Sequence, residues 1–418
     1  MSDSSWSWAA ELTSRFLKKP ARLQHLLECL PDTMDPGTRR RCQFLLYGIV
    51  RHWAFLEAGL DEWVKKRPRV GLRAALLVAS FEIMSDLVKG PQIVDHAVRN
   101  IGKKYSKSER GLANAVLRKV SARMSERLLV EPTDAAGIAM RYSHPLWLIE
   151  RWERQFGFEG ALQMAEWDQR EPELYALSLK EDVPVAIGET SQWERYSNLT
   201  KEAWPAVQEQ LDAASIYIQN PGARLAPEML AKFFVDGRVL DLCAAPGGKS
   251  IYLDKFLGEA ASEIVALDLP GSRLARLKSN VAQLGSSRIR VVASDVFNLD
   301  LESIGSFEAV FLDAPCSNTG VMQRKPDVKW RLKREDSKEL AGLQERMLEK
   351  ASSFVCEKGV LLYSTCSIDG DENEGAIDRF LSSSTGQAFE RLESSTSLPW
   401  ESGHDGSGVC AMRWPHRL

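Results

Sequence analysis

The 418-residue sequence contains no run of about 18 consecutive apolar residues, so it offers no candidate for a membrane-spanning helix. Its first residues, MSDSSWSWAAELTSR, include an early Asp and lack the continuous apolar stretch of a secretory signal. Seven cysteines are scattered without a CxxC pair or a Cys/His cluster of zinc spacing, which argues against disulfides and structural metal. We therefore expect a cytoplasmic protein with reduced thiols and with neither membrane nor metal among its partners.

Two further absences narrow the class of fold. The sequence has no internal repeat and no long low-complexity tract, so solenoid and disordered proteins are excluded. It also lacks a GxGxxG turn, which weighs against an NAD-dependent oxidoreductase. A chain of 418 residues is too long for one ordinary core and predicts about two or three domains.

Positive charge is concentrated at the front of the chain. Residues 1–130 carry 23 Lys and Arg against 13 Asp and Glu, whereas the remainder carries 31 against 44. The basic clusters are TRRR (38–41), KKRPR (65–69) and GKKYSKSER (102–110). Such clusters bind nucleic acid phosphates, but a solvated helical surface would have the same composition, and charge alone leaves both interpretations open.

The apolar pattern divides the chain into three segments. Residues 1–128 have apolar positions at three- and four-residue spacing, interrupted by Gly and Pro, which predicts an all-α domain. Residues 129–225 are mixed and predict a connector or a small α+β subdomain. From 226 to 418 short apolar strands alternate with helical stretches, which predicts an α/β Rossmann-like domain with a parallel sheet.

The predicted strands of the third segment all end in polar, Gly-rich or Cys-bearing turns. They are RVLDLCA (238–244), EIVALDL (263–269), IRVVASD (289–295), EAVFLDA (308–314) and GVLLYSTC (359–366). Ligands of parallel sheets bind outside the carboxyl ends of the strands, where the strand order reverses. We therefore expect these turns to meet at one cleft.

The first of these turns, DLCAAPGGKS (241–250), opens a helix. Gly247 and Gly248 allow the backbone to approach a ligand closely, and the helix N-terminus presents free N–H groups. Asp268 ends the next strand, where carboxylates accept hydrogen bonds from ribose hydroxyls, and Asp295 ends the third strand on the adenine side. The pattern favours an adenosine cofactor other than a dinucleotide, although a simple tight turn also accounts for the glycines.

Two cysteines follow the fourth and fifth predicted strands. Cys316 lies in DAPCSNTG (313–320), close to Asp313, and Cys366 lies in STCS (364–367). If these two strands are neighbours, both thiols face the same end of the cleft. Each thiol alone is more simply explained as core packing, but two thiols in polar turns at corresponding strand ends weigh against that explanation.

The motifs LDLCAAPGGKS, FLDAPCSNTGVMQRKPDVKWR and LLYSTCSIDGDENE, in this order and spacing, resemble those of the RNA 5-methylcytosine methyltransferases of the RsmB (Fmu/Sun) family. The basic front, with LLYGIVRHWAFLEAGLDEWV and RGLANAVLRKV, resembles the NusB-like helical RNA-binding domain that precedes the catalytic domain in that family. The resemblance spans nearly the whole chain and is strongest from 238 to 375.

This resemblance implies a class I methyltransferase that transfers a methyl group from S-adenosylmethionine to C5 of a cytosine in RNA, with 16S rRNA of the small subunit as the expected substrate. It implies that Cys366 is the nucleophile that adds to C6 of the base, that Cys316 assists product release, and that Asp313 contacts the base. The implied cofactor residues are Cys243, Ala244, Ala245, Pro246, Gly247, Gly248, Lys249, Asp268, Asp295 and Asp313.

A stacked cytosine hides C5 and C6, so the target must be single-stranded or flipped out. The segment RKPDVKWR (324–331) offers four cations for phosphates and one aromatic ring for base stacking, or else is a basic loop with a packed Trp. These residues are Arg324, Lys325, Lys329, Arg331 and Trp330. The chain departs from the pattern of the family it resembles at Asn318, where Gly is usual, and in QNPGARLA (219–226) and HDGSGVCAMRW (404–414).

Two alternatives to this function stay open. A non-catalytic RNA-binding factor for ribosome assembly would need neither thiol, and the same reaction on tRNA or another RNA would need both. Methylation of DNA is disfavoured because DNA cytosine methyltransferases carry a different motif, in which the cysteine of the Pro-Cys pair is the nucleophile. We expect the protein to be a monomer.

Overall fold

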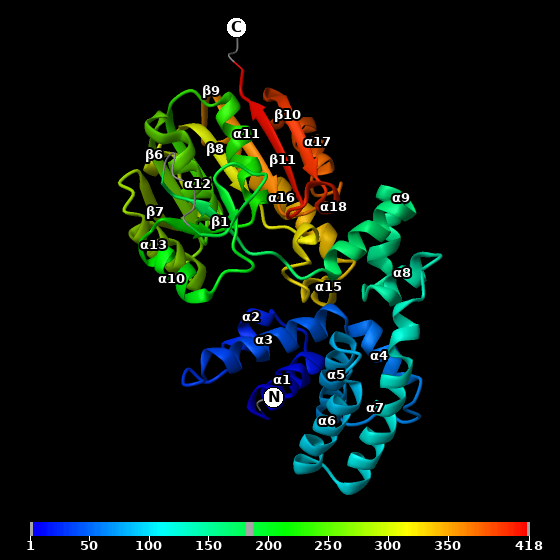
Figure 1. Cartoon of the computed structure of the whole chain (residues 1–418). Coiled ribbons are helices and arrows are strands. Elements are labelled where there is room, and N and C mark those ends of the chain that lie inside the picture. Colours follow the sequence, from blue (N-terminus) through cyan, green and yellow to red (C-terminus); the bar gives the residue numbers. More distant parts are fainter. Residues whose placement is uncertain (1–2, 181–186, 416–418) are drawn as a thin grey trace. The chain divides into compact units, whose positions relative to one another are not determined.

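The computed structural model describes residues 3–180 and 187–415, and the chain forms two compact units. The first unit comprises Met1–Glu171 together with Met322–Arg334, and the second comprises Pro172–Val321 together with Glu335–Leu418. The short segment 322–334 therefore leaves the second unit and returns to it (yellow in Figure 1). The predicted middle segment, 129–225, is divided between the two units after Glu171.

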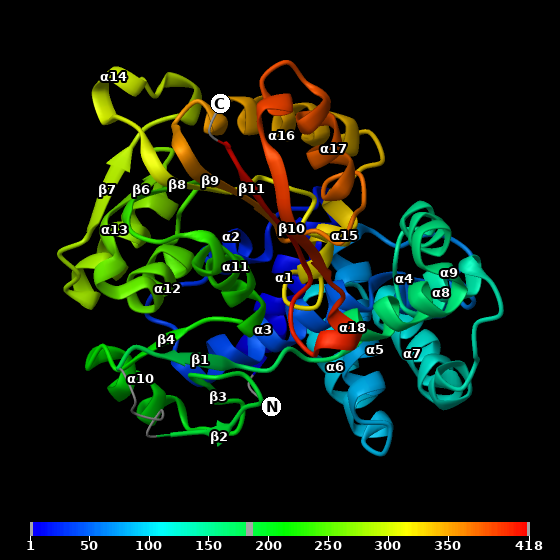
Figure 2. The same cartoon turned by 90° about the horizontal axis from the view of Figure 1, so that it is seen from above.

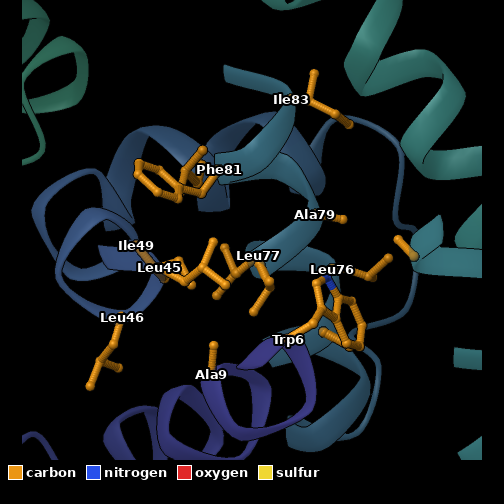
Figure 3. Packing of buried hydrophobic residues seen from close by; sticks show 14 of the residues in the cluster. Trp6, Ala9, Leu45, Leu46, Ile49, Leu76, Leu77, Ala79, Phe81 and Ile83 are labelled. Atoms are coloured by element: carbon orange, nitrogen blue, oxygen red, sulfur yellow. The ribbon is translucent and has the colours of Figure 1, made fainter. Parts of the chain in front are cut away.

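The first unit is helical, as predicted for residues 1–128. Its elements are α1 (Asp3–Lys18), α2 (Leu23–Leu27), α3 (Pro36–Arg51), α4 (Trp53–Asp61), α5 (Val70–Ser85), α6 (Gly90–Lys104), α7 (Lys107–Leu128), α8 (Ala135–Arg141), α9 (Leu146–Gln169) and the short α15 (Val328–Arg331). Helix α5 is buried along nearly its whole length because α1, α3, α4, α6 and α7 surround it. Figure 3 shows Ala9 of α1, Leu45 of α3 and Leu77 of α5 turned towards one another in this core.

Local sequence signals set the ends of these helices. Ser106 begins α7 with a capping box, in which its hydroxyl accepts from the Glu109 backbone N–H and the Glu109 carboxylate accepts from the Ser106 N–H. Asp35 caps α3 by accepting from the Thr38 N–H. Gly157, with φ of 74°, interrupts α9 and divides it into two helical stretches.

The main sheet of the second unit has the strand order β10-β11-β9-β8-β5-β6-β7. Its strands are β5 (Gly237–Leu242), β6 (Ala261–Asp268), β7 (Ile289–Ala293), β8 (Phe307–Asp313), β9 (Val355–Thr365), β10 (Glu390–Ser397) and β11 (Ser407–Arg413). Strands β5 to β9 are parallel and correspond to the five predicted strands, and β8 pairs with β9 as expected. The strand order reverses between β5 and β8, whereas β10 and β11 form an antiparallel edge that the sequence analysis did not predict.

Helices cover both faces of this sheet (Figure 2). Helices α11 (Leu225–Phe233), α12 (Gly248–Leu257) and α13 (Ser272–Leu284) pack on one face, and α16 (Asp336–Ser352) and α17 (Glu374–Ser382) pack on the other. The central strands are therefore apolar on both faces, as Val239 and Leu240 of β5 illustrate by entering opposite cores. This arrangement is the doubly wound α/β fold that the alternating pattern predicts.

A smaller sheet precedes the main one, in the order β2-β3-β1-β4. Its strands are β1 (Tyr175–Ser178), β2 (Glu189–Thr190), β3 (Tyr196–Asn198) and β4 (Ile216–Ile218), with α10 (Trp204–Asp212) before the last strand. The runs LYALSL and SIYIQN of the sequence correspond to β1 and β4. The hydroxyl of Tyr217 in β4 accepts from the Asn280 side chain of α13 at 3.2 Å, which joins this sheet to the helices of the main sheet. In the described part of the chain, every helix is too short or too polar to cross a bilayer.

Candidate active site

The candidate site lies at the carboxyl ends of the parallel strands, around the point where the strand order reverses. The five strand ends carry Cys243, Asp268, Asp295, Asp313 and Cys366, in chain order. Because parallel strands end at the same edge of a sheet, the fold brings together the turns that the sequence analysis singled out.

The glycine loop between β5 and α12 is fixed to the end of β6. The backbone N–H of Ala245 donates to Asp268 Oδ2 at 2.9 Å. Gly247 has φ of 104°, and a Cβ at this position would lie 2.5 Å from Leu277 Cδ1. The left-handed backbone of Gly247 therefore favours glycine, whereas a Cβ at Gly248 would meet only Gln219 Nε2, the end of a flexible side chain, at 2.8 Å.

Asp268 and Asp295 follow adjacent strands and differ in how they are held. Asp268 is 9% exposed and accepts from the N–H groups of Ala245 and Leu269, at 2.9 and 2.8 Å. Each of its carboxylate oxygens retains a second acceptor site for a hydroxyl group. Asp295 accepts from the Phe297 N–H at 3.0 Å and starts a short 3-10 turn.

Cys243 shares the strand-end position of the other two thiols, but its environment is different. It adopts φ of 63°, and burial raises the pKa of its thiol to about 12. Cys243 therefore stays protonated at neutral pH and is unsuited to act as a nucleophile.

Asp241 is a buried residue of the same loop motif that the sequence analysis did not assign. Its Oδ2 accepts from the Ser250 hydroxyl at 2.5 Å, and its Oδ1 has no partner among the described residues. Burial raises the pKa of this carboxyl to about 7. The pair links the end of β5 to the first turn of α12, and the spacing D-x8-S in DLCAAPGGKS is the signal that could have revealed it.

Lys249 connects the glycine loop to the ends of strands β8 and β9. Its ammonium group donates to Asp313 Oδ1 and to Ser364 Oγ, the latter at 3.1 Å. The Ser364 hydroxyl donates to the same Asp313 oxygen at 2.9 Å. Ser364 was not predicted, although it lies two residues before Cys366 in a strand whose side chains alternate.

The thiols of Cys316 and Cys366 lie together, with 3.3 Å between the two Sγ atoms. The Cys366 thiol also donates to Asn318 Oδ1 at 3.4 Å, and Asn318 Nδ2 donates to the Cys316 carbonyl at 2.7 Å. The hydrogen bond between the thiols, together with burial, raises the pKa of Cys316 well above its usual value. Cys316 therefore remains a thiol and can donate its S–H to the Cys366 sulfur.

The two cysteine loops are held together by buried hydroxyl groups. Ser367 Oγ lies 3.1 Å from Ser317 Oγ and 2.9 Å from Thr319 Oγ1. The Gly320 N–H donates to the Cys366 carbonyl at 3.1 Å. These contacts join the loop after β8 to the loop after β9 and so fix the separation of the thiols.

The segment 322–334 corrects one expectation of the sequence analysis. Lys329 is fully buried in the first unit and donates to the Arg51 carbonyl at 3.0 Å. Trp330 donates its indole N–H to the Val50 carbonyl at 2.8 Å and packs against Trp53, with 5.0 Å between ring centroids. Of the two interpretations of this segment, the packed Trp is confirmed, and phosphate binding by Lys329 and base stacking by Trp330 are wrong, because both side chains are used inside the helical unit.

The remaining cations of RKPDVKWR differ from one another. Arg331 pairs with Asp327 at 2.8 Å. Arg324 is half-buried and Lys325 is exposed, so contacts of these two side chains with RNA stay predictions. Within residues 3–180 and 187–415, no group of three or more His, Cys, Asp or Glu side chains is placed to hold a metal ion.

Both parts of the chain are similar to known proteins. Residues 230–417 match the family model described as 16S rRNA methyltransferase RsmB/F, and residues 7–122 match the NusB family model. Ribosomal RNA small subunit methyltransferase B of Erwinia tasmaniensis is 28% identical over 396 residues, which cover 89% of each chain. The protein of the same name from Pasteurella multocida is 28% identical over 438 residues, which cover 97% of this chain and 95% of that one.

Solved structures show the same fold at lower identity. The structure of PH0851 has a TM-score of 0.75 at 21% identity and covers 99% of each chain. A methyltransferase homolog protein from Pyrococcus horikoshii has a TM-score of 0.58 at 22% identity and covers 68% of this chain and 99% of that one.

Proposed function

Residues 230–417 belong to the RsmB/F family of 16S rRNA methyltransferases, behind a NusB-family domain, and we propose from this premise that the chain methylates C5 of a cytosine in 16S rRNA with S-adenosylmethionine as methyl donor. The observation that carries the proposal is the pair of thiols, Cys316 and Cys366, at 3.3 Å. A methyltransferase for an oxygen or nitrogen atom would have no use for two thiols in contact.

The loop at the end of β5 has the features that an adenosine cofactor requires. The absence of a Cβ at Gly247 leaves the backbone close to Leu277 of α13, and the second acceptor sites of the Asp268 carboxylate suit ribose hydroxyls. Asp295, at the next strand end, is assigned to the adenine side of the cofactor in this proposal. S-adenosylmethionine supplies an electrophilic methyl group on sulfur when it is bound.

The nucleophile in this mechanism is Cys366. C5 of cytosine is a weak nucleophile, so a thiolate first adds to C6, and C5 becomes an enamine carbon that can attack a methyl group. The neighbouring Cys316 S–H stabilises the Cys366 thiolate by donating a hydrogen bond to it. Asp313, held by Lys249 and Ser364, is placed to contact the N3 and N4 edge of the base.

Cys316 takes part in the return to free enzyme. After methyl transfer C5 still carries its proton, and the base is released only when that proton is removed and the bond between C6 and the Cys366 sulfur breaks. The electrons of the C5–H bond then restore the C5=C6 double bond, and the sulfur leaves as a thiolate. Cys316 assists this elimination by donating a hydrogen bond from its S–H to the departing thiolate, while a base of the site or a water molecule takes up the C5 proton.

The alternative of a non-catalytic assembly factor predicts no constraint on the thiols. The hydroxyl contacts of Ser317, Thr319 and Ser367 fix their separation, which favours an enzyme. The names of the two relatives support small-subunit rRNA over tRNA as the substrate.

The proposal is tested with the full-length protein, labelled S-adenosylmethionine and unmodified 16S rRNA, followed by mass spectrometry of the nucleosides. We expect 5-methylcytidine from the wild type and none from Cys366→Ala. Cys356→Ala is the matched control, because Cys356 lies near the start of the same strand, β9, and should leave the yield unchanged. Equal yields from Cys366→Ala and the wild type, or a methyl group found on another atom, would contradict the proposal.

A further inference from the structure

We propose that Asn318 is a positioning residue that ties the two cysteine loops together and holds Cys366 as a thiol in the resting enzyme. The description of Cys366 as the nucleophile rests on the proposed function. Asn318 Nδ2 donates to the Cys316 carbonyl at 2.7 Å, and the Cys366 thiol donates to Asn318 Oδ1 at 3.4 Å. One side chain therefore contacts both loops.

The backbone of Asn318 holds its side chain in this position. Asn318 has φ of 63°, a left-handed conformation that asparagine adopts more readily than most residues. The carbonyl of Asn318 accepts from the Val321 N–H at 3.2 Å, and the N–H of Gly320 donates to the Cys366 carbonyl at 3.1 Å. On the other side, the Ser317 N–H donates to a Glu372 carboxylate oxygen at 3.0 Å. The turn is thus fixed on both sides of Asn318.

The orientation of the carboxamide follows from its stronger contact. The Nδ2 group is committed to the Cys316 carbonyl, so the oxygen end faces the Cys366 sulfur. A carboxamide oxygen can only accept a hydrogen bond, and it therefore stabilises the thiol and not the thiolate. Cys316 acts in the opposite direction, because its S–H can donate to the thiolate.

Other titratable groups surround the thiol pair. Glu372 and Tyr363 interact electrostatically with Cys316, and Asp313 interacts with Tyr363 from the end of β8. Burial raises the pKa of the Glu372 carboxyl and raises that of Tyr363 well above its usual value. Substitution of Asn318 leaves these groups in place, so a change at Cys366 in such a variant reports on the carboxamide.

Glycine is the residue usual at this position in the pattern that the sequence resembles. It would keep the left-handed turn and would contribute no side-chain contact. Asn318→Gly is therefore a variant that removes the carboxamide without straining the backbone. Asn318→Asp keeps the shape and replaces the Nδ2 donor with a negative charge.

The test is the rate of iodoacetamide alkylation of Cys366 between pH 6 and 10, measured on the full-length protein without RNA by mass spectrometry of the cysteine peptides. Only the thiolate reacts, so the profile reports its ionisation. We expect Asn318→Gly to react about threefold faster than the wild type at neutral pH, since one hydrogen bond to the thiol is lost. We expect Asn318→Asp to react about tenfold more slowly, because a carboxylate disfavours the thiolate.

Cys356 serves as the internal control, because it lies near the start of β9, and its alkylation profile should be the same in the three proteins. Superimposable Cys366 profiles in the wild type and Asn318→Gly would overturn the proposal, even if Asn318→Asp failed to fold. The two proposals fail separately. If the Cys366 alkylation profile shifts in Asn318→Gly but the wild type transfers no methyl group, the role of Asn318 stands and the proposed function is rejected. If the wild type transfers a methyl group but the profile does not shift, the proposed function stands and the role of Asn318 is rejected.

Discussion

Two adjoining stretches of one connection, residues 314–321 and 322–334, have different structural roles. The first stays with the sheet and brings Cys316 to Cys366 through small polar side chains. The second belongs to the helical unit and buries Lys329 there. Both stretches lie within a single recognisable motif, so a motif that is continuous in sequence can be divided between two folding units.

The second stretch shows why a basic and aromatic composition does not identify an RNA contact. The last carbonyls of a helix have no partner within the helix and attract donors and positive charge. Lys329 and Trp330 donate to the carbonyls of Arg51 and Val50 at the end of α3. The residues that looked suited to phosphate and base therefore cap a helix.

The largest effect is expected in the first stretch. Cys366→Ala should lower methyl transfer by about 10³-fold or more, because the covalent step is lost. The free energy of unfolding should change little, since Cys366 is half-buried and the substitution removes only the weak hydrogen bonds of its thiol. A loss of activity accompanied by loss of cofactor binding, measured by calorimetry, would mean that the variant disturbs the fold and not the chemistry.

The second stretch should respond in the opposite way. Trp330→Ala should lower the free energy of unfolding of the helical unit by about 2–3 kcal/mol, because it removes a half-buried ring and leaves the Val50 carbonyl unpaired. The measurement is urea unfolding followed by circular dichroism. Trp204→Ala is the matched control, since Trp204 is 48% exposed on α10 and should cost much less. Equal losses in both variants would break the comparison.

The buried ammonium group of Lys329 predicts a pH dependence of stability. Burial lowers the pKa of Lys329 to about 7, below its ordinary value of about 10.4. Between these values the unfolded chain binds a proton that the folded chain lacks, so the free energy of unfolding rises with pH from about 7 to about 10. Below about pH 7 both the folded and the unfolded chain bind this proton, so Lys329 no longer makes the free energy of unfolding depend on pH.

Lys329→Met should remove that rise. The measurement is urea unfolding of the wild type and the variant at pH 7 and pH 9. We expect the free energy of unfolding to increase less between pH 7 and pH 9 in the variant than in the wild type. An identical increase would show that another group is responsible.

The smallest effect is expected at Lys325, an exposed cation of the second stretch. Lys325→Ala should weaken binding of 16S rRNA only severalfold and lower the slope of log affinity against log salt by about 1, as expected for one phosphate contact. Lys232→Ala, on α11, is the control for an exposed lysine, because Lys232 is paired with Glu393 of β10. A salt slope unchanged by Lys325→Ala would contradict the predicted contact of Lys325 with RNA.

The sequence was sufficient to predict strands β5 to β9 and the pairing of the two thiols. Strands β5 to β9 are short apolar runs followed by distinctive turns, and the neighbouring positions of β8 and β9 follow from the usual strand orders of doubly wound sheets. The antiparallel edge was missed because β10 is the polar run ERLESSTS, most of it solvent-accessible, which has no apolar alternation to reveal a strand.

The missed contacts depend on residues far apart in the chain. Lys329 and Trp330 meet acceptors 278 and 280 residues earlier, and no local pattern records which helix end lacks donors. The role of Asn318 depends on a backbone angle and on two loops that meet only in the folded sheet. Sequence motifs indicate which residues carry chemistry, whereas their partners follow from the tertiary structure.

The most direct test of the central claim is a search for the covalent intermediate. Cys316→Ala, incubated with S-adenosylmethionine and unmodified 16S rRNA and run on a denaturing gel, should accumulate a protein–RNA adduct, because release is impaired while addition is intact. The adduct should disappear when Cys366→Ala is added to the same protein. An adduct that persists without Cys366, or no adduct from a variant that still binds the cofactor and the RNA, would contradict the two-thiol mechanism.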